Sequence, residues 1–197
     1  MSEIMLGKNE RILNRLDPHD KLILYGANAL GKDLKTEVKM QKLLFLTMNA
    51  ISDKAFKEMD FIPHKKGPYS QLIEQKMEEL SDNGLISLPN CHVSELGKEI
   101  SNEASPKKPL RDIVDDFKEF VCMLKEDELL AFIYLTFPEY KFDSEEWERI
   151  SKNMPSIAAS MLKKGAVSYS KALEMSGMSE YDFSEYLKKQ GVRWRVV

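Results

Sequence analysis

The chain has 197 residues, of which 43% are hydrophobic and 31% charged, with 29 basic residues against 32 acidic ones and a net charge of −3. This balance excludes binding of nucleic acid through bulk positive charge but allows a local basic patch. Two cysteines exclude a disulfide framework, and no apolar run is long enough to span a membrane, so we expect a cytoplasmic protein.

The first strong signal predicts a helix that begins at Asp17-Pro18 and ends at Gly31. Aspartate caps the free amides of a helix start, proline suits the first turn, and glycine accepts the left-handed conformation that ends a helix. Residues 38–48 are too apolar for a surface helix. We therefore expect a central helix there, capped by Thr36.

The chain then changes from helix to hairpin. A helix is predicted from Tyr69-Ser70 to Asn83-Gly84, and residues 85–88 and 91–93 are predicted to be short strands joined by a Pro-Asn turn. Another helix opens at Ser94. This order is typical of a winged helix-turn-helix domain, which we expect to span residues 1–105.

We expect residues 106–154 to form an acidic helical segment. A Pro- and Lys-rich linker at 105–109 precedes an amphipathic stripe at 110–124 and an apolar one at 129–135. Asp143 and Glu146 predict a capping box before a helix that carries Trp147. Residues 109–150 hold 5 basic and 12 acidic residues, and their net charge of −7 favours contact with protein over phosphate.

Residues 155–197 predict a small C-terminal helix-turn-helix domain. From residue 156 onward the chain holds 7 basic and 4 acidic residues, a net charge of +3. Helices are predicted at 156–164, after Ser168 and after Ser179. The tight turn Gly177-Met178-Ser179 between two short helices is typical of a helix-turn-helix.

One motif match suggests nucleotide chemistry. Residues 26–33 place two glycines and Lys32 at the spacing of a phosphate-binding loop, but Asp33 stands where a hydroxyl must hold Mg²⁺. No His and Cys cluster suits a metal, and Cys122 is expected to be an inert buried thiol. We therefore expect a non-enzymatic protein with no catalytic residue, cofactor or metal, and an enzyme that uses residues 26–33 is the weakest alternative.

Both helix-turn-helix units carry candidate DNA contacts. The start of the helix at residue 70 suits phosphate, the two lysines before it are candidate phosphate clamps, and its glutamines suit adenine. Glu74, Glu78 and Glu79 on the same helix oppose such binding. Basic residues of the tail can hold phosphates without reading sequence. The candidate DNA-binding residues are Lys65, Lys66, Tyr69, Ser70, Gln71, Gln75, Lys188, Lys189, Arg193 and Arg195.

Three stretches resemble known families. Residues 38–46 (VKMQKLLFL), 66–70 (KGPYS) and 80–86 (LSDNGLI) resemble the YwgA-like proteins of bacteria and archaea and the Panacea (SocA-like) antitoxin domains. Both groups carry a Lys-Leu-Leu-aromatic helix and a Gly-Pro turn before a helix. Residues 93–100 (VSELGKEI) are also similar to the wing-to-helix passage of MarR/PadR-type regulators. The resemblance implies a winged-helix regulator or a toxin-neutralising domain.

The tail is similar to a second family, the small antitoxin-like helix-turn-helix proteins of archaea and cyanobacteria. The stretches MLKKGAVS at 161–168 and KALEMSGMSEYDFSEYLKKQGV at 171–192 carry this likeness. Leu173 stands where the family's second Ala packs, and Ser176 replaces the Ala before Gly177. These departures weaken the inference of DNA binding, and neither family implies a cofactor.

Two functions follow from these patterns. The first is a DNA-binding transcriptional regulator, including an autoregulating antitoxin, which would act as a homodimer because most DNA sites are two-fold symmetric. The alternative is a protein-interaction module, toxin-neutralising or scaffolding, that does not touch DNA. Convergence of Lys65, Lys66 and the basic tail on one face would favour DNA, whereas their segregation by the acidic segment would favour a protein partner.

Overall fold

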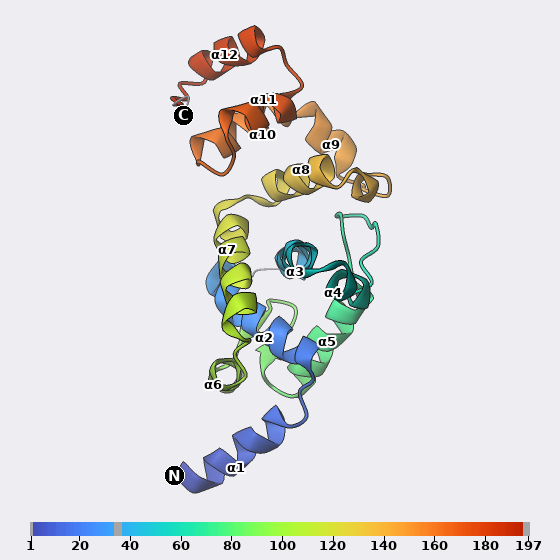
Figure 1. The fold of residues 1–197 in the computed structure, drawn as a ribbon, viewed down its shortest axis with the longest axis vertical. Coiled ribbons are helices and arrows are strands. Elements are labelled where there is room, and N and C mark those ends of the chain that lie inside the picture. Colours follow the sequence, from blue (N-terminus) through green and yellow to red (C-terminus); the bar gives the residue numbers. More distant parts are fainter. Residues whose placement is uncertain (1, 34–36, 195–197) are drawn as a thin grey trace. The chain divides into compact units, whose positions relative to one another are not determined.

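A computed structural model describes the chain at residues 2–33 and 37–194. The protein is mostly helical, with 69% of its residues in helices, and the described strands form a small two-stranded antiparallel sheet (Figure 1). The predicted mostly α class is confirmed. No helix in the described ranges is long and apolar enough to cross a membrane.

The contacts divide the chain into two compact units. The first comprises residues 1–61 and 69–119, and the second comprises residues 62–68 and 120–197. The loop at 62–68 therefore groups with the C-terminal residues. The expected division into residues 1–105, 106–154 and 155–197 stays a prediction.

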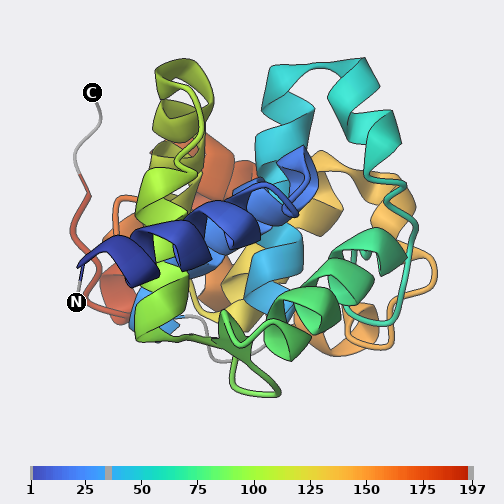
Figure 2. The same cartoon turned by 90° about the horizontal axis from the view of Figure 1, so that it is seen from below.

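The first unit is arranged around helix α2 (Pro18–Leu30), which contacts most of its other elements. These are η1 (Gly31–Asp33), α3 (Glu37–Ile51), α5 (Gln71–Asp82), β2 (His92–Val93) and α6 (Glu95–Glu103). The remaining elements are α1 (Ser2–Leu13), α4 (Asp53–Glu58), β1 (Ile86–Ser87) and most of α7 (Lys108–Met123). In Figure 2, α1 crosses α6, with which it is in contact.

The capping signal at Asp17-Pro18 is confirmed. The Asp17 carboxylate accepts hydrogen bonds from the amides of His19 (2.7 Å) and Asp20 (2.9 Å), and the Asp20 carboxylate accepts one from the Asp17 amide. Gly31 follows the helix with φ 50°. Residues 26–30 lie inside α2, so the phosphate-loop alternative for residues 26–33 has no strand and no loop to support it.

Helix α3 is the central helix that its composition predicts. Every residue from Met40 to Met48 is buried, including the polar Gln41 and Lys42. Phe45 packs edge-on against Phe61 with ring centroids 5.3 Å apart. The predicted cap, Thr36, lies outside the described residues.

The predicted hairpin forms with shorter strands. Ile86 pairs with Val93 and Ser87 with His92, so the first pair faces the core and the second faces solvent. Ser94 caps α6 as predicted, because its hydroxyl accepts a hydrogen bond from the Gly97 amide at 2.9 Å.

The second unit is a chain of helices. Its elements are α8 (Glu126–Thr136), η2 (Pro138–Lys141), α9 (Trp147–Lys152), α10 (Met154–Lys163), α11 (Tyr169–Ser176) and α12 (Glu180–Lys189). Helix α8 contacts α9 and α10, α10 contacts α11, and α11 contacts α12 (Figure 1). Ser168 and Ser179 cap α11 and α12 as predicted, and Gly177 ends α11 in the left-handed conformation.

The predicted capping box at Asp143 and Glu146 is wrong. Glu146 precedes α9 in a helical conformation without a side-chain cap, and its amide donates to the Ser144 hydroxyl at 3.1 Å. The Asp-x-x-Glu spacing fits a capping box, but the Glu146 amide donates to the intervening Ser144 instead. The Ser144 hydroxyl is held in place by its hydrogen bond to the Lys65 carbonyl, in a loop far away in the sequence.

Gly97 is required by a close approach of two backbones. A Cβ at this position would lie 2.0 Å from the Leu85 carbonyl oxygen, and backbone atoms cannot yield as a flexible side chain can. We predict that Gly97→Ala lowers the free energy of unfolding by at least about 1–3 kcal/mol, as overpacking does elsewhere. Urea denaturation followed by circular dichroism measures this loss.

Gly7→Ala is the matched control. Apart from the adjacent backbone of α1, no atom of the described residues lies within 4 Å of a Cβ at Gly7, so the change is expected to be neutral or to stabilise the helix slightly. Equal stability of Gly97→Ala and the wild type would contradict the close approach.

Candidate nucleic-acid interface

The loop that carries Lys65 and Lys66 is held by the acidic segment of the second unit. The Lys65 carbonyl accepts hydrogen bonds from the Glu145 amide (3.0 Å) and the Ser144 hydroxyl (3.2 Å). Ser144 is in turn hydrogen-bonded to the Tyr134 hydroxyl at 2.6 Å. The backbone of the loop that carries the two predicted phosphate clamps is therefore bound to a segment rich in carboxylates.

Both lysines of this loop form ion pairs. Lys65 Nζ lies 2.8 Å from Glu145, and Lys66 Nζ lies 3.3 Å from Glu126. The hydrogen bond that Lys65 donates to Glu145, together with the charge of that carboxylate, raises the pKa of Lys65, so the ammonium stays protonated but is partly neutralised. A phosphate group would have to compete with these carboxylates for each lysine.

Ser70 is buried and fully engaged. Its hydroxyl donates to the Met59 carbonyl (2.5 Å) and caps α5 by accepting from the Ile73 amide (3.4 Å). Gln41, buried in α3, accepts from the Ser70 amide (2.9 Å) and donates to the Ser70 carbonyl (3.0 Å). This predicted base reader therefore fastens α5 to α3 and presents no group to solvent.

The exposed face of α5 is acidic. Gln71 and Gln75 are exposed as the DNA hypothesis requires, but the Tyr69 hydroxyl donates to Glu74. Burial and the adjacent Glu74 raise the pKa of Tyr69 to about 12. Burial, followed by the charges of Glu74 and Glu78, raises the pKa of Glu37. Carboxylates thus gather around Tyr69, one of the predicted DNA contacts.

Lys76 is the single basic residue of α5, and it is bound on the side of α2. Its ammonium lies 2.8 Å from Glu79, 2.9 Å from Asp17 and 3.3 Å from Asp20 Oδ1, the last at ion-pair distance without hydrogen-bond geometry. The hydrogen bonds that its ammonium donates to Glu79 and Asp17 raise the pKa of Lys76 well above its ordinary value. The side chain is 15% exposed, so this cation is not offered to phosphate.

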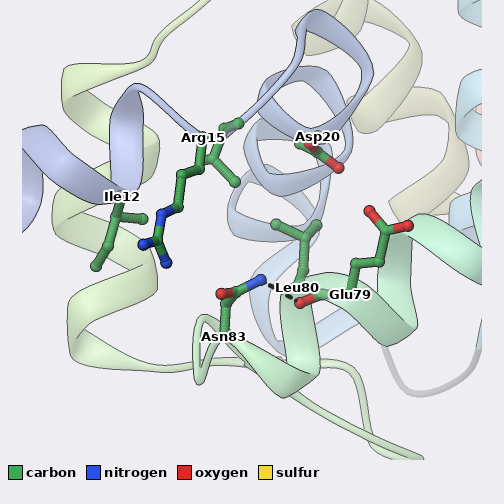
Figure 3. Close-up of a pocket in the computed structure, with 7 residues that line it drawn as sticks. Ile12, Arg15, Asp20, Glu79, Leu80 and Asn83 are labelled. Carbon is green, nitrogen blue, oxygen red and sulfur yellow. Dashed lines mark hydrogen bonds between the residues drawn. The ribbon is translucent and has the colours of Figure 1, made fainter.

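A small cavity of about 110 Å³ adjoins this network. Figure 3 shows the carboxylates of Asp20 and Glu79 on one side and the side chains of Ile12 and Arg15 on the other, with Asn83 below. The Asn83 amide donates to the Glu79 carbonyl at 2.7 Å. The cavity holds a few water molecules at most and is too small for a nucleotide base with its sugar.

The tail residues are exposed but mixed in charge. Lys188 pairs with Glu185 at 2.7 Å, and Lys189 and Arg193 are exposed. The start of α12, where a recognition helix reads bases, exposes Glu180 and Asp182. Arg195 lies outside the described residues.

A cavity of about 500 Å³ lies beside the start of α11. Lys163 and Arg193 line it, together with Trp194, whose ring stacks on Tyr169 with centroids 5.6 Å apart. These two cations form no ion pair with any described residue. They are the basic groups of the second unit best placed to meet an anion.

Lys164, the neighbour of Lys163, forms an ion pair with a buried carboxylate of the second unit. Its ammonium lies 2.6 Å from Glu128, which is 3% exposed, and it also donates to the Met123 carbonyl. Burial raises the pKa of Glu128, but hydrogen bonds from Lys164, Ser160 and the Lys125 amide outweigh it and hold that pKa below its usual value. This pair fastens α10 to α8.

Sequence reasoning missed the hydrogen-bond and ion-pair partners that organise this surface. Gln41, Glu126, Ser144 and Glu145 decide where the predicted DNA contacts lie, and each is far from its partner in the sequence. Only the net charge of −7 over residues 109–150 signals that carboxylates are available to neutralise nearby lysines.

No family model matches the chain, and no curated protein and no solved structure is found to be similar to it. The described residues hold no group of three or more His, Cys, Asp or Glu side chains placed to bind a metal ion.

The Glu128–Lys164 pair makes a prediction about stability. Lys164→Met leaves a buried carboxylate without its cation, which costs about 3 kcal/mol of unfolding free energy, the lower end for such breaks because Lys164 is 27% exposed. Chemical denaturation at pH 7 measures this loss. Lys171→Met, which breaks the exposed pair with Glu174, is the control and is expected to cost less than about 1 kcal/mol.

The free energy of unfolding of the wild type and that of Lys164→Met are expected to depend differently on pH. In the wild type the pKa of Glu128 is lowered on folding, so its contribution is present above the ordinary value of 4.5 and is lost as the pH falls through the lowered pKa. In Lys164→Met burial raises this pKa, so the deficit shrinks as the pH falls from 7 to about 5. A deficit independent of pH would contradict the ion pair.

Proposed function

We propose that the protein is a non-catalytic regulatory module that binds another protein, of the toxin-neutralising or scaffolding kind, and that DNA is not its principal partner. The carrying observation is the capture of Lys65 and Lys66 by Glu145 and Glu126. Pairing of these lysines with carboxylates of the acidic segment favours a protein partner over phosphate.

The charge of the exposed helices supports this proposal. The outward side of α5 offers Glu78 and Glu79, and its one lysine is bound to α2. DNA binding depends on cations that replace the counterions of the phosphates. An acidic face is repelled by the phosphates of DNA but complements a basic protein surface.

The order of elements in the first unit supports a winged-helix frame for the module. Helices α2, α3 and α5 are followed by the β1–β2 hairpin and α6, as the sequence predicts for such a domain. A fold of this kind does not by itself imply DNA binding, because function depends on the surface residues. In this proposal α5 occupies the place of a recognition helix without its charge.

DNA binding by the second unit is the other candidate. Lys163, Lys189 and Arg193 favour it, because they are exposed and none is ion-paired with a described residue. Such contacts would hold phosphates without reading sequence. A preference for one DNA sequence would therefore require base readers elsewhere.

Titration of labelled DNA tests the proposal. The duplex from upstream of the protein's own gene and a scrambled duplex are each followed by fluorescence anisotropy at several salt concentrations. We expect equal binding of the two duplexes, with dissociation constants no tighter than about 10⁻⁶ M at physiological salt. Glu126→Gln with Glu145→Gln releases both lysines and is expected to steepen the log–log salt slope by up to about 1.8.

Glu139→Gln with Asp143→Asn is the matched control. It removes the same two charges from exposed positions of the second unit but releases no lysine, so the slope should stay that of the wild type. The proposal is overturned if the wild type prefers its own upstream duplex by about 10³-fold or more. Flattening of that slope by Lys65→Ala with Lys66→Ala would then place the DNA on this loop.

A further inference from the structure

We infer that an apolar groove of the first unit is the docking site for an amphipathic helix of a partner protein, one that carries carboxylates beside its apolar stripe. This inference rests on the proposed function and names the chemistry of the partner. The groove has a volume of about 620 Å³ and lies between the start of α2, the end of α3 and the segment 104–113.

The lining of the groove is almost wholly apolar. Leu22 of α2 is buried at 5% exposure, Ile51 at the end of α3 is 39% exposed, and Leu110 and Ile113 of α7 are partly exposed. These side chains present a continuous apolar surface to solvent. An exposed apolar groove with few polar groups is typical of a site that binds a ligand or another protein.

The charge at the groove is positive. Among the residues that the structure describes, the charged ones in its lining are Lys21 and Lys107, and none of the lining residues is a carboxylate. Neither lysine is ion-paired with a described residue, whereas Lys65, Lys66 and Lys76 are. A partner that buries apolar side chains here therefore gains if it places carboxylates against the two free ammonium groups.

The backbone around the groove favours a helical partner. An extended segment needs an exposed strand edge for its amides and carbonyls, and neither of the described strands lines this groove. One wall contains Pro106 and Pro109, which have no amide hydrogen to donate. A helix satisfies its own backbone groups and can dock through side chains alone.

Binding of designed peptides tests the inference. The probe is a fluorescein-labelled peptide of about 15 residues with Leu at i, i+3, i+4 and i+7 and Glu elsewhere. Its partner probe has Lys in place of every Glu, and a third has the Leu and Glu residues scrambled. We expect the wild type to bind the Leu/Glu peptide in preference to the other two.

Charge reversal makes the test specific. Lys21→Glu with Lys107→Glu is expected to weaken binding of the Leu/Glu peptide by about tenfold or more and to strengthen binding of the Leu/Lys peptide. Lys163→Glu with Lys189→Glu reverses two exposed charges of the second unit and should bind as the wild type does. Circular dichroism of both variants verifies their folding.

Three outcomes overturn the inference. One is equal binding of the three peptides by the wild type, and another is unchanged binding by Lys21→Glu with Lys107→Glu. The third is saturation of the groove by octanoate without binding of any peptide, which would assign it to a small carboxylate. The DNA titration involves neither Lys21 nor Lys107, so its outcome and that of the peptide titration can be read separately.

Discussion

The ion pairs of Lys76 join the start of α2 to α5 and thereby determine the charge that α5 presents. Asp17 and Asp20 cap α2, and the same two carboxylates hold the ammonium of the one basic residue on α5. The start of α2 is therefore stabilised by the residue that would otherwise give α5 a positive charge. Breaking the network would leave Asp20, which is 4% exposed, without its cation.

The second unit uses its cations in the same way. Lys164 forms an ion pair with the buried Glu128, and carboxylates of the acidic segment pair with Lys65 and Lys66. These ion pairs partly neutralise the cations involved, so the positions of the other basic residues decide which anions the surface can bind. In the first unit, Lys21 and Lys107 remain beside an apolar groove; in the second, Lys163 and Arg193 remain beside the Trp194 ring.

Local signals were the reliable ones. The caps at Asp17, Ser94, Ser168 and Ser179 were predicted because a capping side chain acts on amides two or three residues away. The predicted box at Asp143 failed for the converse reason: Ser144 binds the carbonyl of Lys65, 79 residues away, and no local pattern reports such a contact.

The sequence alone determined the mostly α class, the helix boundaries at the capped ends and the short hairpin, because each depends on residues close together in the chain. Only the tertiary structure decided that Ser70 is buried, that Lys65 and Lys66 meet Glu145 and Glu126, and that Gly97 lies against Leu85. Charge pairing and burial depend on which distant segments come together. Composition states how many carboxylates and ammonium groups there are, but the folded chain decides which of them remain free to bind a partner.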